Sequence, residues 1–246
     1  MRFETESAVI REAFPTAYAE LAIVITELGG QSVLMLVLAT LFWVSNRRRS
    51  ALVIAYAFAG FSLLLALKAA LGVARPPEEL FLKPLASDEY GFPSGHAFAA
   101  TVVYGGLVSA YDRVGDPATV AGAVALILSI SLSRVVLGVH YLGDVLVGVV
   151  LGVAFLIAMN RLTRGSPRRA FAVAVALSVP ALAIVGPSPE AMLGFGGSVG
   201  GLAVSNRIDR LPARRSRLEG VVLVVGIILT PAAVGRLETD TLGGAR

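Results

Sequence analysis

The sequence of 246 residues contains no cysteine, only two histidines and few charged side chains. The absence of cysteine excludes disulfide bonds, thiolate metal sites and thiol redox chemistry. Charged residues make up 15% of the chain and hydrophobic residues 56%, which is far from the composition of a soluble globular protein. No stretch resembles a solenoid repeat, a low-complexity tract or a long linker. This composition predicts a single domain that lies in a membrane.

Long apolar runs dominate the chain. Runs close to the length that crosses a bilayer, about 20 residues, recur along it, and each must be a helix because backbone polar groups need partners in lipid. The sequence therefore predicts an all-α, polytopic transmembrane bundle. We expect about eight spans, at 17–44, 51–73, 95–111, 118–136, 141–160, 170–185, 191–205 and 220–234.

The stretch before the first span is charged and amphipathic, which predicts a helix that lies in the membrane interface. We divide the chain into this interfacial helix at 1–16, a membrane core at 17–165 and additional C-terminal transmembrane helices at 166–246.

The basic excess of the chain, a formal net charge of +4, has the distribution of a membrane protein. Arginines concentrate in alternate loops between the predicted spans, at 47–49, 161–169 and 207–217. Under the positive-inside rule these loops face the cytoplasm, and both ends of the chain face outward. We therefore expect an integral, multi-pass protein of the cell membrane, with no nucleic-acid partner.

Several ionisable side chains fall at the ends of the predicted spans, where charges are costly and indicate function by default. All lie on the face opposite the arginine-rich loops: Lys68, Arg75, His96, Arg134, His140 and Asp144. A helix running from Lys68 to Arg75 would place both on one face, two turns apart, and Pro76 would end it. Asp144 follows His140 by four residues, which would put the two on one helical face.

The residue types at this face permit two kinds of site. His96, His140 and Asp144 match a metal centre with two histidines and one carboxylate. The three nearby cations would repel a metal ion but suit an anion, and guanidinium groups match phosphate oxygens. The stretch PSGH at 93–96 favours the anion, because Gly95 lets the backbone approach closely and helix N-terminal amides bind anions. We expect a phosphate cradle without a metal or other cofactor.

A phosphate site with two histidines and an aspartate predicts phosphoryl transfer. Asp144 can accept a hydrogen bond from one nitrogen of His140, which leaves the other nitrogen as a nucleophile. Attack would give a phosphohistidine, and the cations would offset the charge on the phosphate oxygens. His96 can protonate the leaving alkoxide and then activate water.

These residues resemble the three-part signature of the type-2 phosphatidic acid phosphatase superfamily, the lipid phosphate phosphatases. The matching stretches are KAALGVARP at 68–76, PSGH at 93–96 and SRVVLGVHYLGD at 133–144. Every defining position is present: Lys68, Arg75, Pro76, Pro93, Ser94, Gly95, His96, Ser133, Arg134, His140 and Asp144. Three motifs with the right spacing and order make a specific signal, and the resemblance covers roughly 17–160.

The resemblance implies a metal-independent phosphatase in which His140 is the nucleophile, His96 the acid and Asp144 the partner of His140. The phosphate would be bound by Lys68, Arg75, Ser94, Gly95 and Arg134, with support from Pro76, Pro93 and Ser133. Vanadium haloperoxidases share such a site, but they are soluble, and the apolar spans argue against that branch.

The sequence favours hydrolysis of a phosphomonoester or pyrophosphate on a lipid at the outer leaflet. Candidate substrates are phosphatidic acid, phosphatidylglycerol phosphate and polyprenyl diphosphate carriers. One alternative is a phosphotransferase that passes the phosphoryl group to another alcohol. The other is a channel, transporter or scaffold with an inactive site. The sequence leaves the oligomeric state open.

Overall fold

The computed structural model describes residues 2–82, 90–211, 219–220, 222 and 225. Within these ranges the chain is helical, and its extended pairing is limited to an isolated bridge between Ala74 and Tyr90. The α-helices are α1 (Glu4–Ala13), α2 (Ala19–Glu27), α3 (Gln31–Val44), α4 (Arg47–Leu71), α5 (Gly95–Ala100), α6 (Gly106–Ala110), α7 (Pro117–Val136), α8 (Leu142–Thr163), α9 (Pro167–Val185) and α10 (Pro189–Val204). A π-helical turn, η3 (Thr101–Gly105), joins α5 to α6, and 3₁₀ turns lie at η1 (Thr16–Tyr18), η2 (Glu78–Leu80) and η4 (Ser205–Arg210).

Four of the described helices, α4, α7, α8 and α9, are long and apolar enough to cross a membrane. Together, α2 and α3 make a fifth candidate that bends by 46° at its break. The segment Gly95–Ala110 is apolar but shorter, and α10 has 16 residues. The prediction of an all-helical chain with several apolar spans is confirmed for the described residues, whereas the count of eight stays a prediction. The eighth span, 220–234, lies almost wholly outside the described residues.

The first predicted span is broken at the pair Gly29–Gly30. A Cβ atom at Gly29 would collide with the side chain of Ile130 on α7 and would touch the ring of His96. Glycine therefore allows α7 and α5 to approach the break closely. The sequence predicted one continuous helix here, and the structure shows two.

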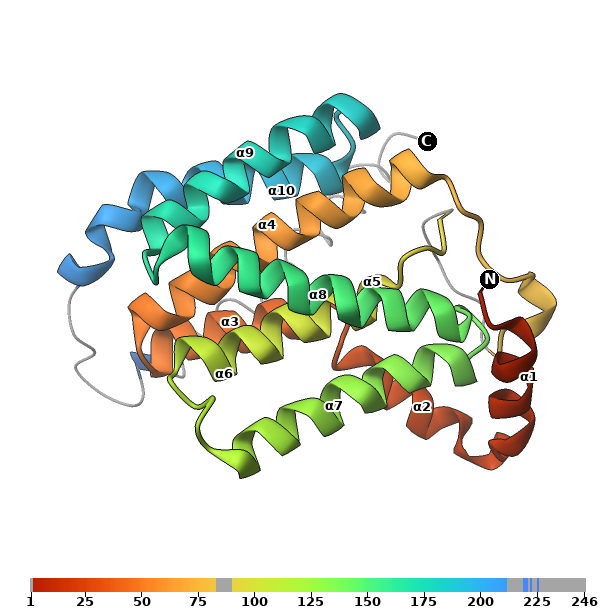
Figure 1. Cartoon of the computed structure of the whole chain (residues 1–246). Helices are drawn as coiled ribbons and strands as arrows, with labels where there is room; N and C mark the ends of the chain where they lie inside the picture. Colours follow the sequence, from red (N-terminus) through yellow and green to blue (C-terminus); the bar gives the residue numbers. More distant parts are fainter. Residues whose placement is uncertain (1, 83–89, 212–218, 221, 223–224, 226–246) are drawn as a thin grey trace, which may run out of the picture.

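Helix α4 lies at the centre of the bundle, with α9 packed along it and α10 covering both (Figure 1). Its Tyr56 is fully buried, and the hydroxyl of Tyr56 bonds to Thr163 of α8 at 2.9 Å. A Cβ atom at Gly197 of α10 would collide with Phe58 of α4, so the glycine permits close packing. The division of the chain at residue 165 stays a prediction; in space, α9 lies directly against α4.

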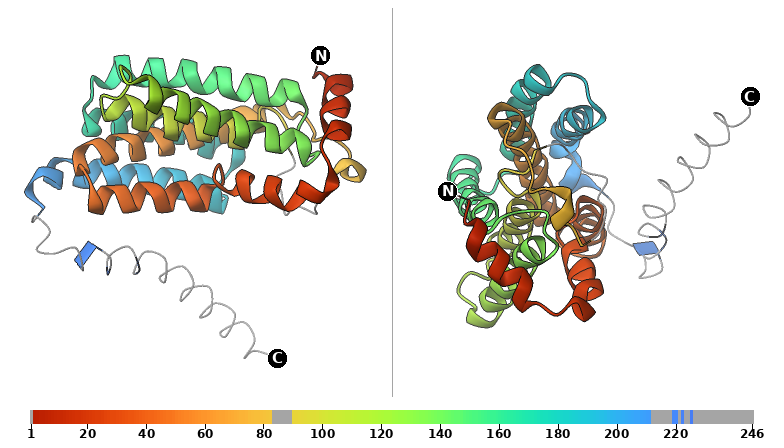
Figure 2. Two further views of the ribbon diagram at one scale, coloured as in Figure 1. Left: turned by 90° about the horizontal axis from the view of Figure 1, so that it is seen from below. Right: turned by 90° about the vertical axis from the view of Figure 1, so that its right-hand side faces the viewer.

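Helix α1 lies across one end of the bundle, roughly at right angles to the long helices (Figure 2). It contacts α7 and α8, and its Ser7 is fully buried. A helix thus lies at the start of the chain, and the hypothesis that it is an amphipathic helix in the membrane interface stays a prediction. The same end of the bundle holds the C-terminal end of α4 and the N-terminal ends of α5 and α8 (Figure 1).

Candidate active site

The first motif lies where α4 ends. Gly72 adopts a left-handed conformation (φ 60°) and closes the helix after Leu71, so Arg75 is not helical. The prediction that Lys68 and Arg75 share a helix face is therefore wrong. The chain beyond Gly72 is instead extended and pairs with the second motif, because Gly91 donates its backbone N–H to Val73 at 2.8 Å. A Cβ atom at Gly91 would collide with the backbone of Arg75.

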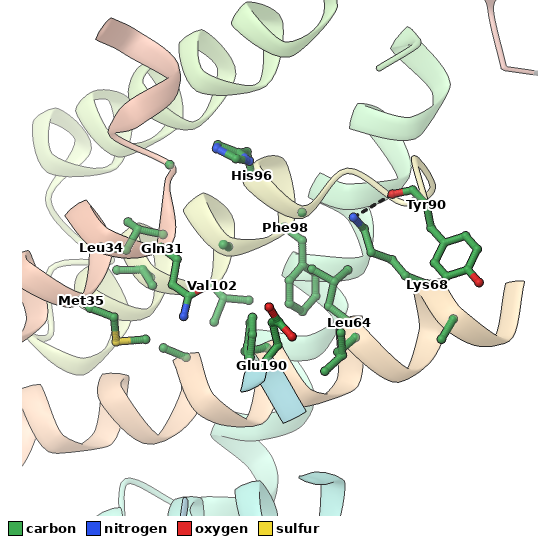
Figure 3. A pocket seen from close by; sticks show the side chains of 18 of the residues that line it. Gln31, Leu34, Met35, Leu64, Lys68, Tyr90, His96, Phe98, Val102 and Glu190 are labelled. Atoms are coloured by element: carbon green, nitrogen blue, oxygen red, sulfur yellow. Dashed lines mark hydrogen bonds between the residues drawn. The ribbon is translucent and has the colours of Figure 1, made fainter. Parts of the chain in front are cut away.

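Lys68 is buried in the last turn of α4. Its Nζ donates to the carbonyl oxygen of Tyr90 at 2.9 Å, and Figure 3 shows this bond at the edge of a cavity. Arg75 also lines this cavity, although it lies outside the helix that carries Lys68. The two cations are brought together by the turn at Gly72 and not by helical spacing.

The second motif begins α5. Ser94 is the N-cap residue, and its backbone N–H donates to the carbonyl oxygen of Asp144 at 3.0 Å. The Ser94 hydroxyl is buried without a hydrogen-bond partner in the described structure. Gly95 and His96 follow on the first turn and line the cavity. Pro93, before Ser94, is buried, as is Pro76 of the first motif.

His96 lies apart from the hydrogen-bonded groups of the site. Its ring approaches the break between α2 and α3 at Gly29, and in Figure 3 it points away from Lys68. It is nevertheless within electrostatic range of Arg134, His140, Arg75 and Lys68. The structure therefore places His96 beside the cationic cluster, on the side of the broken helix.

The third motif spans the end of α7 and the start of α8. Arg134 is buried in the last turn of α7, and its Nη1 donates to the hydroxyl of Thr26 on α2 at 2.9 Å. Ser133 is buried too, and its hydroxyl bonds to the carbonyl oxygen of Ile130 at 2.7 Å. Thr26 did not stand out in the sequence, because an isolated threonine in an apolar helix carries no functional pattern.

His140 lies in the short segment between α7 and α8. Gly138 turns the chain there with φ 77°, and a Cβ atom at this position would collide with the carbonyl of Leu80. The Nε2 atom of His140 is 3.3 Å from Nη1 of Arg75. Because a guanidinium group can only donate, Nε2 is the acceptor and the ring proton sits on Nδ1.

Asp144 is fully buried on the first turn of α8 and accepts the backbone N–H of Tyr141 at 2.9 Å. Its Oδ2 atom lies 3.6 Å from Nδ1 of His140. This separation is just longer than a hydrogen bond, and Nδ1 has no other partner in the described structure. The predicted contact between these residues is thus a close approach. The two residues do not share a helical face as predicted, because His140 precedes α8 and only Asp144 lies in it.

Burial lowers the pKa of His140 to about 4. The charges of Arg134 and Arg75 act in the same direction, while Asp144 opposes them by favouring the protonated ring. The lowered pKa keeps His140 neutral at neutral pH. Neutral imidazole with its proton on Nδ1 has a free electron pair on Nε2, which is the state that a nucleophile requires.

A cavity of about 750 Å³ joins these groups to an apolar chamber. Its polar end carries Lys68, Arg75, His96 and His140. Away from this end the lining is mostly hydrocarbon, from α3, α4, α5 and η3: Leu34, Met35, Ala57, Phe61, Leu64, Leu65, Phe98, Val102 and Val103. Gln31 and Glu190 add two polar side chains to the lining (Figure 3). The volume lies within the range of small-molecule sites.

Some groups in this region were not predicted from the sequence. Glu190, at the start of α10, lines the cavity, and Arg2 binds Asp144. Neither residue is near a motif in the sequence, and only the packing of distant segments brings them to the site. Conversely, no cluster of three histidine, aspartate or glutamate side chains suited to a metal ion occurs in the residues that the structure describes.

The family model described as the PAP2 superfamily matches residues 49–168. This range contains all three motifs and the helices that carry them. The chain is thus similar to the PAP2 superfamily over this segment. The match confirms the resemblance seen in the sequence. The PAP2 family suggests a phosphatase that acts on lipid-like phosphates. No curated protein and no solved structure matches the chain.

The PAP2 segment does not contain the whole cavity. The break before α3 contributes Gly29, and α3 contributes Leu34 and Met35, all of which precede the segment, while α10 follows it and contributes Glu190. The surroundings of the motifs are therefore built partly by parts of the chain that the PAP2 match does not cover.

Proposed function

We propose that this protein is a membrane phosphatase that removes phosphate from a lipid phosphomonoester or pyrophosphate through a phosphohistidine at His140. The observation that carries the proposal is the two-part cavity. One end presents two cations and two histidines, and the remainder is lined mostly by hydrocarbon, with Gln31, Ser188 and Glu190 as polar exceptions. A lipid phosphate has the same two parts, and the match of residues 49–168 to the PAP2 superfamily supports the same substrate class.

In the first step, the phosphate of the substrate lies among Lys68, Arg75 and Arg134, which offset its charge. Arg75 moves its hydrogen bond from Nε2 of His140 to a phosphate oxygen. The freed electron pair on Nε2 then attacks phosphorus, a P–N bond forms, and the P–O bond to the lipid breaks. His96 gives a proton to the departing oxygen.

In the second step, water attacks the phosphohistidine. His96, now neutral, takes a proton from the water, the new P–O bond forms, and the P–N bond breaks to return its electron pair to Nε2. Throughout both steps Asp144 faces the Nδ1 proton of His140 and stabilises the positive charge that the ring acquires as it is phosphorylated.

The test of this function is phosphate release by the purified protein in detergent. We expect turnover of lipid phosphates that carry long chains. The value of kcat/KM should exceed that for glycerol 3-phosphate by a factor on the order of 100 or more, because each methylene group buried in the chamber contributes about 0.8 kcal/mol. Equal rates on both substrates would contradict a lipid site. If none of these substrates releases phosphate, the proposal of a phosphatase is contradicted.

Vanadate should inhibit phosphate release, whereas a chelator should not. The proposed site surrounds an anion with fixed cations, so EDTA is expected to leave kcat/KM unchanged within about twofold. Vanadate should inhibit, because its five-coordinate form mimics the phosphoryl transition state. Phosphate release measured with EDTA, with vanadate and with both checks this prediction. A loss of activity in EDTA that a divalent ion restores would contradict it.

We place the site on the extracytoplasmic side of the membrane, because the arginine-rich loops lie at the other ends of the same helices. The chain has no cysteine, so single cysteines report the topology directly. Glu79→Cys, in η2 beside the site, and Arg168→Cys, in the first turn of α9, both replace exposed residues. In intact cells an impermeant maleimide should label position 79 and spare position 168 until the membrane is permeabilised. The reverse pattern would place the site in the cytoplasm.

A further inference from the structure

Arg2 binds the carboxylate of Asp144 through both of its oxygens. Nε donates to Oδ1 at 2.8 Å and Nη2 donates to Oδ2 at 2.7 Å. The Asp144 side chain is fully buried, whereas that of Arg2 is 22% exposed, so Arg2 reaches the carboxylate from the surface. A two-pronged guanidinium–carboxylate pair is strong and fixes orientation as well as charge.

The surrounding chain holds Arg2 in this position. Its Nη1 donates to the carbonyl oxygen of Ala74, next to Arg75, at 2.8 Å, and its guanidinium group lies 4.7 Å from the centre of the Tyr141 ring. The carbonyl of Arg2 accepts the N–H of Gly143 at 3.1 Å. A Cβ atom at Gly143 would press against the Arg2 backbone, so close approach requires glycine here.

Helix α1 adds a second anchor on the same turn of α8. The hydroxyl of Ser7 accepts the backbone N–H of Leu142 at 2.8 Å and donates to the carbonyl of Phe3. Ile10 and Leu142 both pack against the buried cluster that contains Val145. The N-terminal segment that contains Arg2 therefore packs directly against the first turn of α8, which contains Asp144.

Arg2 and His140 face the same oxygen of Asp144. Oδ2 accepts from Arg2 at 2.7 Å and from the Tyr141 backbone at 2.9 Å, and it lies 3.6 Å from Nδ1 of His140. Arg2 and the backbone N–H of Tyr141 thus make the hydrogen bonds that hold the carboxylate, and His140 lies just beyond hydrogen-bond distance. Any change at Arg2 alters how much of the carboxylate charge the ring of His140 experiences.

We propose that Arg2 is a positioning residue for the phosphatase, which acts on the nucleophile His140 through Asp144. This inference rests on the proposed function. Arg2 does not line the cavity, so it acts without touching the substrate. It fixes the plane of the carboxylate and balances its charge, and both effects set the orientation and basicity of the imidazole.

The direction of the effect follows from the charges that face this pair. Asp144 faces Arg2 and His140, and His140 faces Arg75 and Arg134 as well as the ring of His96. Without Arg2, the carboxylate can turn to pair with Nδ1 of His140, which favours the protonated ring. The pKa of His140 should then rise, and the acid limb of kcat/KM should move to higher pH by about one unit.

The experiment compares Arg2→Gln with Arg2→Lys, which keeps the charge, and with Arg11→Gln, which removes the same charge from helix α1. We expect Arg2→Gln to lower kcat about tenfold, because the carboxylate is no longer held in plane, while KM changes less than threefold. Arg2→Lys should recover part of kcat and most of the pH profile. Arg11→Gln should leave both unchanged. A thermal unfolding curve for each variant separates these effects from loss of the fold.

A second measurement does not depend on activity. The chain has two histidines, so ¹⁵N NMR of histidine-labelled protein resolves the ring of His140, with His96→Gln for assignment. In Arg2→Gln the His140 ring should titrate at higher pH than in the wild type. An unmoved titration together with an unmoved acid limb would overturn the inference, and so would a kcat that rises. A wild-type protein that releases no phosphate would contradict the proposed function instead, while the ring titration would still test the link from Arg2 to His140.

Discussion

His140→Ala is expected to reduce phosphate release by a factor on the order of 10⁴ or more, since it removes the proposed nucleophile. The wild type should form an acid-labile phosphoenzyme when it is quenched during turnover of a ³²P-labelled lipid phosphate, and the variant should form none. We expect a large effect both because His140 is the proposed nucleophile and because of where its ring lies. Nε2 of His140 lies at the polar end of the cavity, 3.3 Å from a guanidinium group that can bind the phosphate.

Two controls make this result specific. The His140→Ala protein should unfold at a temperature close to that of the wild type, because the ring makes few hydrogen bonds. Added imidazole should restore part of the turnover by entering the space that the side chain leaves. Persistent acid-labile labelling in His140→Ala would show that another residue is the nucleophile.

Asp144→Asn should lower kcat by a factor of about 10³ to 10⁴, close to the effect of losing the orienting carboxylate in other histidine-dependent sites. The amide carries no charge to stabilise the ring as it is phosphorylated, and it leaves Arg2 facing a neutral group. Because Asp144 favours the protonated form of His140, its removal should also shift the acid limb of kcat/KM to lower pH. Steady-state kinetics from below pH 4 up to pH 8 measure both changes.

Asp116→Asn is the matched control for this prediction. Asp116 is the N-cap of α7 at the opposite end of the bundle, and its carboxylate accepts the backbone N–H of Ala118 at 3.1 Å. The same substitution there should leave kcat within about twofold of the wild type. An Asp144→Asn protein with a normal kcat would remove Asp144 from the mechanism.

The motifs predicted which residues come together, but not how the chain brings them together. The spacing between Lys68 and Arg75 suggested one helical face, yet Gly72 ends α4 after Leu71 and the two meet through a turn. The sequence predicted His140 and Asp144 on one helix, whereas His140 precedes α8. In both cases, motif spacing is compatible with more than one backbone path, and a left-handed glycine or a helix cap decides between them.

Contacts between distant segments could not be predicted from the sequence. Arg2 and Asp144 are separated by 142 positions, and a single arginine near the start of a chain has no pattern that distinguishes it from a solvated charge. The same holds for Thr26, which meets Arg134, and for Glu190, which reaches the cavity from α10. The break at Gly29–Gly30 interrupts the span predicted at 17–44, and its cause, the close approach of Ile130 and His96, lies in the packing.

The two-part cavity has a consequence for the order in which products leave. Inorganic phosphate is soluble in water, but under the proposed function the dephosphorylated lipid would keep its chain among the apolar side chains of the cavity, such as Leu34 and Val102. The alcohol thus retains most of its binding energy after the phosphoryl group is gone. Product inhibition by the lipid alcohol is the natural outcome. At high occupancy, the pace of the cycle is then set by the exchange of one lipid for the next and not by cleavage of the P–O bond.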